Sequence, residues 1–198
     1  MNTVLLQEIF NQSKLSSKLK WHCEPSDWKI QKDQLVIAAD AETDFWQKTH
    51  YGFQADNGHF LYAEVSGDFV LTTQVHCNFK NQYDQAGLML RISEDCWVKA
   101  SVEFEAGEPN KLGAVVTNHG YSDWSTQDVE DSFTDFKLRI IRNGSTYLVQ
   151  YFHTISGDWI QIRMFHLFDR PIVKAGIYCC SPKKDGFTAH FNFLKIED

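Results

Sequence analysis

From residue 20 onward, apolar and polar side chains alternate along the chain with a period of two. In the segment 69–79, for example, Leu71 and Val75 fall on one side, and Thr72 and Gln74 fall on the other. This alternation is typical of antiparallel strands that bury one face and expose the other. The sequence therefore predicts a chain built from half-buried strands.

The pattern recurs in ten segments joined by short polar connections, among which Asn143-Gly144 is a strong hairpin turn. The predicted strands are 60–65, 69–79, 86–92, 97–105, 111–117, 135–141, 145–152, 159–165, 173–180 and 187–196. No long helical pattern alternates with them, so an α/β layout is disfavoured. We expect an all-β sandwich of two antiparallel sheets over residues 20–198.

The first 19 residues differ from this pattern. Leu5 and Ile9 stand near helical spacing, but the apolar stripe is thin. The segment 1–19 is therefore predicted to be a short helix or an arm that lies on the sandwich.

Composition agrees with one domain. The chain has 198 residues, 43% of them hydrophobic, and 15 are Phe, a residue that suits pleated surfaces. The net charge is −7, and the longest cationic run, Lys183-Lys184, reads as a solvated loop. Nucleic acid and anionic membranes, which need basic patches, are therefore not expected as partners.

The chain start lacks the order of a signal peptide, and no apolar run is long enough to span a membrane. The five cysteines are odd in number and contain no CxxC pair. Neither a disulfide framework nor a zinc ribbon is indicated. We expect reduced thiols in a cytoplasmic protein.

The segment 97–105 has two different faces. Val98, Ala100 and Val102 read as core, whereas Lys99, Glu103 and the other odd-numbered residues point the opposite way. Glu103 and Glu105 would then present two carboxylates to one groove. Paired carboxylates cleave glycosidic bonds in glycoside hydrolases, which makes Glu103 a candidate catalytic residue.

Other chemistry has no signature in this sequence. The eight histidines form neither HxH nor HExxH, and an Asp-rich calcium loop is missing. There is also no GxSxG elbow and no glycine-rich phosphate loop. The sequence therefore indicates no metal and no cofactor.

Three segments, 43–53, 83–87 and 117–125, are dense in polar and aromatic residues and are predicted to be loops around one concave groove. Aromatic rings offer flat faces to sugars, and polar side chains offer directional hydrogen bonds. The cationic side chains of Arg91, Lys99 and His50, which are expected around the same groove, would favour a ligand with an acidic or phosphorylated group. The candidate ligand-binding residues are Asp44, Trp46, His50, Tyr51, Asp84, Gln85, Arg91, Lys99, Glu103, Ser122, Asp123 and Trp124.

Several of these stretches, in register, resemble a known family. They are TDFWQKTHYGF, DNGHF, YDQAGLMLRI, WVKASVEFE, VVTNHGYSDWS and the final GIYCCSP. The chain looks like a bacterial and fungal family of unknown function whose yeast members are named for regulation of enolase. The resemblance implies a jelly-roll sandwich similar to the concanavalin A-like lectins and glucanases. It also implies, by fold analogy alone, carbohydrate binding on the concave sheet.

The chain departs from the glucanase relatives at their catalytic strand. Those relatives carry Glu-x-Asp-x-(x)-Glu, and Glu103-Phe104-Glu105 keeps only a fragment of that motif. Three functions remain open. The first is a module that binds a carbohydrate or small polar metabolite, the second a glycan-cleaving enzyme that uses Glu103, and the third a regulator that binds a metabolic enzyme such as enolase.

Overall fold

The computed structural model describes residues 3–198, which form seventeen strands and no helix. The strands are β1 Val4–Glu8, β2 Lys20–His22, β3 Asp27–Gln31, β4 Gln34–Ala38, β5 Phe45–Gln47, β6 Gln54–Asp56, β7 His59–Ser66, β8 Phe69–Asn78, β9 Gln85–Ser93, β10 Cys96–Glu103, β11 Asn110–Asn118, β12 Tyr121–Val129, β13 Asp135–Asn143, β14 Thr146–His153, β15 Asp158–His166, β16 Ile172–Cys180 and β17 Thr188–Glu197. The all-β prediction is confirmed. Within this part of the chain there is accordingly no helix that could cross a membrane.

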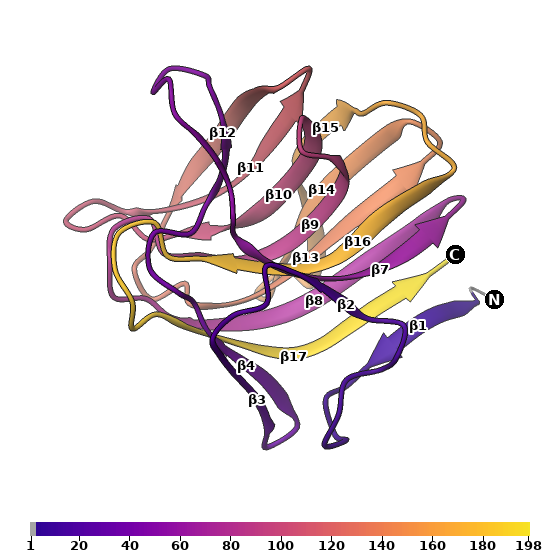
Figure 1. The fold of residues 1–198 in the computed structure, drawn as a ribbon, viewed down its shortest axis with the longest axis horizontal. Helices are drawn as coiled ribbons and strands as arrows, with labels where there is room; N and C mark the ends of the chain where they lie inside the picture. The colour runs from indigo at the N-terminus through magenta and orange to yellow at the C-terminus, as the bar shows by residue number, and fades with distance from the viewer. Residues whose placement is uncertain (1–2) are drawn as a thin grey trace.

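Two large antiparallel sheets make the sandwich (Figure 1). The back sheet has the order β15-β14-β13-β8-β17-β4-β3, with β1 added along β17. The pocket sheet has the order β12-β11-β10-β9-β16-β7-β2. The short pair β5 and β6 forms a third, two-stranded sheet.

The main core fills the space between the two sheets, and strand alternation determines which residues enter it. Val98, Ala100 and Val102 on β10 are fully buried there, as predicted. On the back sheet, Leu71 and Val75 of β8 point inward in the same way. Burying these side chains removes apolar surface from water and holds the sheets together.

A second apolar cluster lies on the opposite face of the pocket sheet. It includes Trp97 of β10 and Tyr178 of β16, which pack against Phe45 and Trp46. Phe45 and Trp46 belong to residues 42–56, a segment that contains β5 and β6 and that we call the flap. The pocket sheet is thus covered on both faces, and this explains why β9 and β10 are buried along almost their whole length.

Gly58 permits the close approach of the flap to the sheet. A Cβ atom at this position would lie 2.4 Å from the ring of Phe45 and 2.5 Å from the Sγ atom of Cys180. A larger residue would therefore push the flap outward.

All ten predicted strands are present as β7–β11 and β13–β17, but seven others were not predicted. Strands β2, β5 and β6 have three residues each, too few to show a period. Strand β12 is largely exposed, so its sequence lacks an apolar face. The segment 117–125 is therefore not a loop, because the β11–β12 hairpin contains it.

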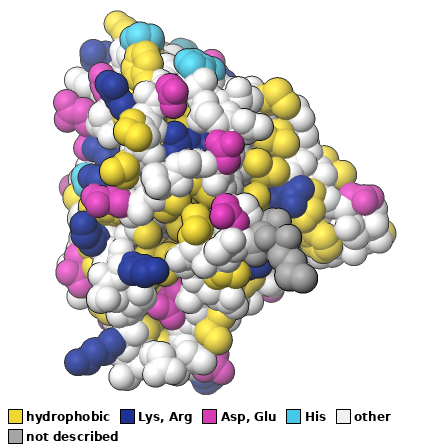
Figure 2. Space-filling view, turned by 90° about the vertical axis from the view of Figure 1, so that its right-hand side faces the viewer, with side chains coloured by type: hydrophobic (Ala, Val, Ile, Leu, Met, Phe, Trp, Pro, Cys, Tyr) yellow, Lys and Arg dark blue, Asp and Glu magenta, His cyan; other side chains and the backbone are white. Residues whose placement is uncertain are grey.

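The N-terminal segment is extended, so the predicted short helix is wrong and the arm alternative describes it better. Strand β1 pairs with β17, and Leu6 packs into the main core. The two ends of the described chain meet, since the amide of Asp198 donates to the carbonyl of Thr3 at 3.0 Å. Figure 2 views the molecule from the side on which the termini lie, where charged side chains of both signs surround apolar ones.

Candidate functional site

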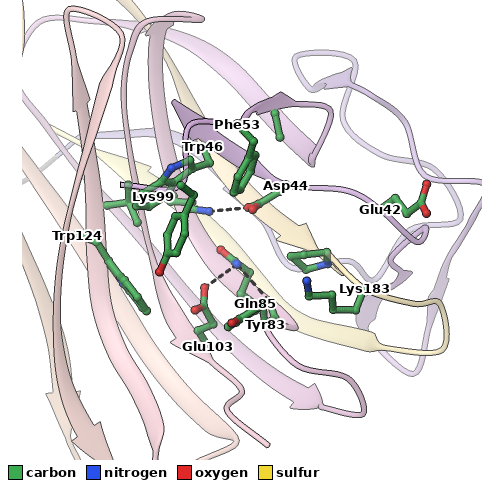
Figure 3. Close-up of a pocket in the computed structure, with 14 residues that line it drawn as sticks. Glu42, Asp44, Trp46, Phe53, Tyr83, Gln85, Lys99, Glu103, Trp124 and Lys183 are labelled. Carbon is green, nitrogen blue, oxygen red and sulfur yellow. Dashed lines mark hydrogen bonds and ion pairs between the residues drawn. The ribbon is translucent and has the colours of Figure 1, made fainter. Parts of the chain in front are cut away.

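A pocket of about 410 Å³ lies between the outer face of the pocket sheet and the flap (Figure 3). Its aromatic lining comes from Trp46, Tyr51, Phe53, Tyr83 and Trp124, and its polar lining from Glu42, Asp44, Gln85, Lys99, Glu103 and Lys183. Ala55, Val115 and Pro182 complete the wall. Apolar walls with a few converging polar groups are typical of small-ligand sites, and this volume is at the smaller end of their range.

The deepest charge in the pocket is the ammonium group of Lys99, whose side chain is only 3% exposed. It lies 2.9 Å from Oδ1 of Asp44, which belongs to the flap. Burial, the largest single effect, would lower the pKa of Lys99. The negative charge and hydrogen bond of Asp44, together with Cys180 and Glu103, outweigh burial and raise the pKa above its ordinary value. The ion pair therefore joins the flap to β10 across the floor of the pocket.

Glu103 projects from the same face of β10 as Lys99, further along the strand. It belongs to a second chain of hydrogen bonds. Its Oε2 atom accepts a hydrogen bond from Nε2 of Gln85 at 2.7 Å. The Gln85 Oε1 atom in turn accepts from the hydroxyl of Tyr178 at 3.1 Å. Gln85 and Tyr178 are both buried, so this chain fixes the carboxyl group at the pocket wall.

Burial raises the pKa of Glu103 to about 8, and the negative charges of Asp44 and Glu105 act in the same direction against the opposing effect of Lys99. At neutral pH the group is therefore mostly a neutral carboxylic acid. One of its oxygens accepts from Gln85, and the acid still holds a proton that it can donate. A pocket acid of this kind can donate a hydrogen bond to a ligand oxygen or act as a general acid.

Aromatic rings line two sides of the cavity. On the flap, Trp46 contacts Tyr51 and Phe53, with ring centroids 5.5 and 6.5 Å away, and its Nε1 atom donates to the carbonyl of Thr49 at 3.0 Å. On the opposite side, Trp124 projects from β12 and is 37% exposed (Figure 3). A flat ligand can be held between these two sides.

The structure brings seven of the twelve predicted residues into this pocket. They are Asp44, Trp46, Tyr51, Gln85, Lys99, Glu103 and Trp124. Five predicted residues lie outside it: His50, Asp84, Arg91, Ser122 and Asp123.

Arg91 and His50 were expected to attract an acidic ligand, and neither lines the cavity. The guanidinium group of Arg91 forms two hydrogen bonds with Asp56, at 2.5 and 2.7 Å, and so fastens β6 to β9. His50 lies on the exposed turn of the flap, edge-on to Tyr51. Glu105 follows the end of β10 and also lies outside the pocket, so the predicted carboxylate pair with Glu103 does not form there.

The remaining three predicted residues, Asp84, Ser122 and Asp123, form hydrogen bonds or ion pairs within the protein. Asp84 is fully buried and accepts from the amides of Lys80 and Asn81; despite these bonds, burial raises its pKa. The hydroxyl of Ser122 accepts from the amide of Gln47 at 2.8 Å and so positions the flap. Asp123 points away from the pocket, because neighbouring strand residues face opposite sides, and it pairs with Arg163 of β15 at 2.8 Å.

Sequence reasoning did not select several residues that line the pocket. Lys183 was interpreted as part of a solvated loop, yet it lies at the pocket rim over the ring of Tyr83, at 5.4 Å. Val115 was assigned only to a strand. It stands directly opposite Lys99 in the β10–β11 register, a position that the hairpin pairing could have indicated. No pattern in the sequence indicated that Glu42 or Pro182 would line the pocket.

Two further observations concern the cysteines and possible metal ligands. All five cysteines are free thiols, four of them buried. Residues 3–198 contain no group of three or more His, Cys, Asp or Glu side chains placed to hold a metal ion.

The two stacked antiparallel sheets define the fold class, which is a jelly-roll β-sandwich. Solved structures support this class. The GH43 protein BlXynB of Bacillus licheniformis, in a mutant form, superposes with a TM-score of 0.77 over 96% of this chain and 38% of its own. The identity of the two sequences is 13%, so this likeness shows the fold alone.

The chain belongs to the family described as protein of unknown function (DUF1349), whose pattern matches residues 21–198. It is 33% identical, over 177 residues, to Regulation of enolase protein 1 of Saccharomyces cerevisiae, with 87% of this chain and 85% of the yeast protein covered. A crystal structure of a functionally unknown protein from Saccharomyces cerevisiae is 30% identical, with a TM-score of 0.84 over 91% of this chain and 96% of that one. The resemblance noted in the sequence is thereby confirmed.

Proposed function

We propose that this protein binds a small neutral carbohydrate, or a similar polyhydroxyl metabolite, in the pocket beneath the flap. The observation that supports the proposal is a cavity of about 410 Å³ with aromatic rings on two sides and hydrogen-bonding groups at its floor. Aromatic faces suit the apolar faces of sugar rings, and polar groups select their hydroxyls. The five free thiols also suit the reducing cytoplasm, which we propose as its location.

The charges of the lining favour a neutral ligand over an acidic one. Lys99 is neutralised by Asp44, and Glu103 is mostly uncharged at pH 7 because its pKa is about 8. Glu42 and Lys183, on the lining near the rim, carry opposite charges. With Arg91 committed to Asp56, the pocket has no excess positive charge to attract an acidic sugar.

A thermal-shift screen tests this proposal. We expect neutral mono- and disaccharides at millimolar concentration to raise the unfolding temperature, because a ligand that binds only the folded state stabilises it. Uronic acids and sugar phosphates should have smaller effects. The absence of any shift with neutral sugars would contradict the proposal.

The contribution of the aromatic walls can be measured with Trp124→Ala. We expect the dissociation constant of the best sugar to rise about tenfold, the equivalent of 1.4 kcal/mol, because the variant loses one apolar face of the site. Tyr121→Ala is the matched control, since Tyr121 is exposed on the same strand but does not line the pocket. Titration calorimetry measures both, and equal losses would argue against a sugar held beside Trp124.

Glycan cleavage remains an alternative proposal, favoured by the raised pKa of Glu103, since a general acid must hold a proton at working pH. The other carboxylate close to it inside the pocket, Asp44, is paired with Lys99. Glu103→Gln keeps the shape but removes the acid. If a sugar binds and is hydrolysed equally by both forms, Glu103 is not the catalytic residue.

Regulation of a metabolic enzyme is a further candidate, favoured by the 33% identity to a yeast protein named for regulation of enolase. Purified enolase passed over the immobilised protein at low salt tests it. Enolase that elutes with the void volume would remove the support for this function.

A further inference from the structure

The outer face of the back sheet, away from both the core and the pocket, carries an unusual group of side chains where β13, β14 and β15 lie side by side. In strand register, Arg139 is opposite Gln150, and Phe152 is opposite Trp159. Lys137 lies 5.5 Å from each of the last two rings. We call these five residues the outer patch.

Two cations of the outer patch share one aromatic ring. The guanidinium carbon of Arg139 is 4.2 Å from the ring centroid of Trp159, and Nζ of Lys137 is 5.5 Å from the same point. The two groups are therefore separated by no more than the sum of these distances. Both lack a carboxylate within 4.0 Å anywhere in residues 3–198.

Arg139 is only partly satisfied by the protein. Its Nε atom donates to Oε1 of Gln150 at 2.7 Å, and its two terminal nitrogens have no hydrogen-bond partner in the described chain. Its side chain is half-buried, and burial lowers its pKa. A desolvated cation without a counter-charge is unfavourable, and an approaching carboxylate would relieve that cost.

The arrangement fits an anion better than a sugar. Two cations lie over the Trp159 ring and Phe152 contacts it edge-on, so this ring already has partners within the protein. None of the outer-patch residues lines the pocket beneath the flap or the second cavity, beside β1 and β7. Small ligands are usually held in a cavity, whereas Trp and Arg are enriched among the residues that dominate binding at protein interfaces.

Apolar side chains extend the outer patch along the same strands. Ile141 stands opposite Leu148, and Leu148 stands opposite Met164, all on the outer face. Met164 is 59% exposed. We propose that this surface binds an acidic segment of a partner protein, whose carboxylates pair with Arg139 and Lys137 while its apolar side chains cover the neighbouring row.

A labelled peptide tests the inference independently of the pocket. The probe is a peptide of about twelve residues made of glutamate, with leucine at every third position, and its binding is followed by fluorescence anisotropy at low salt. We expect Arg139→Gln to weaken binding about tenfold, in keeping with a charge-assisted contact. Rising salt should weaken the wild type further, since exposed charges are screened.

Lys195→Gln is the matched control. Lys195 lies on the same face, since Thr72 is the register partner of both Lys195 and Arg139, but it is already paired with Glu197 at 2.6 Å. We expect this variant to bind like the wild type. Circular dichroism checks that each variant is folded, and Lys137→Gln replaces Arg139→Gln if the latter is not.

Four results would overturn the proposal. The first is that the peptide does not bind at 1 mM, on the order of the weakest useful affinity. The second is that a peptide with lysine in place of glutamate binds equally well, and the third is that Arg139→Gln and Lys195→Gln weaken binding equally. The fourth is that the wild type is a dimer and that Arg139→Gln converts it to a monomer. The last would identify a second copy of this chain as the occupant.

Discussion

Replacing Lys99 with Met is expected to lower the free energy of unfolding by about 3 kcal/mol. The substitution keeps most of the side-chain length but removes the positive charge next to Asp44, whose carboxylate is only 16% exposed. Breaking a buried ion pair by removing one partner is far more destabilising than removing both, because the other charge remains uncompensated. Urea denaturation measures the change.

Two further variants separate the buried charge from general damage. Asp44→Asn in the Lys99→Met background should recover part of the loss, since it removes the uncompensated carboxylate. Lys111→Met removes an ion pair whose acidic partner, Asp128, is 67% exposed, and we expect a much smaller change because solvent screens this pair. If Lys99→Met and Lys111→Met lose equal stability, the pair in the pocket floor does not stabilise the flap.

The second large effect concerns Glu103 and pH. Burial, with the nearby negative charges, raises the pKa of this carboxyl from 4.5 to about 8 in the folded chain. Between those two values the folded chain holds a proton that the unfolded chain has released, so the stability contributed by this group falls as pH rises. Because the pocket admits water, we expect the loss between pH 5 and pH 8.5 to be about 2 kcal/mol.

Glu103→Gln should remove this component, because an amide does not ionise. Denaturation of both proteins at pH 5 and pH 8.5 measures the difference between their pH profiles. Glu108→Gln is the control, since Glu108 is exposed in the connection between β10 and β11 and does not line the pocket. Parallel profiles for the wild type and Glu103→Gln would show that the carboxyl ionises near its ordinary pKa.

The face that carries the site could be predicted because it depends on local geometry alone. Successive side chains of a strand point to opposite sides, so Val98 and Ala100 enter the core and Lys99 and Glu103 must share the other face. The same rule failed for Asp123, because the segment 117–125 was interpreted as a loop. On β12, Asp123 and Trp124 necessarily face opposite sides.

The flap could not be predicted in this way. Its strands have three residues each, and its position depends on contacts between residues far apart in sequence. Arg91, for example, looked available for a ligand until Asp56 of β6 was found against it, 35 positions away. Which ionic groups stay free in a pocket is decided by such pairings, and a single sequence does not contain them.

The two-sided burial of the pocket sheet has a dynamic consequence. Lifting the flap would expose Phe45, Trp97 and Tyr178 to water together, so opening must occur as one local unfolding event with its own free energy. A molecule seated beneath the flap stabilises only the closed state, and the amide protons of β5 and β6 should then exchange with deuterium more slowly. The exchange rates of these few amides would thus report occupancy of the cavity even for a compound that changes no optical signal.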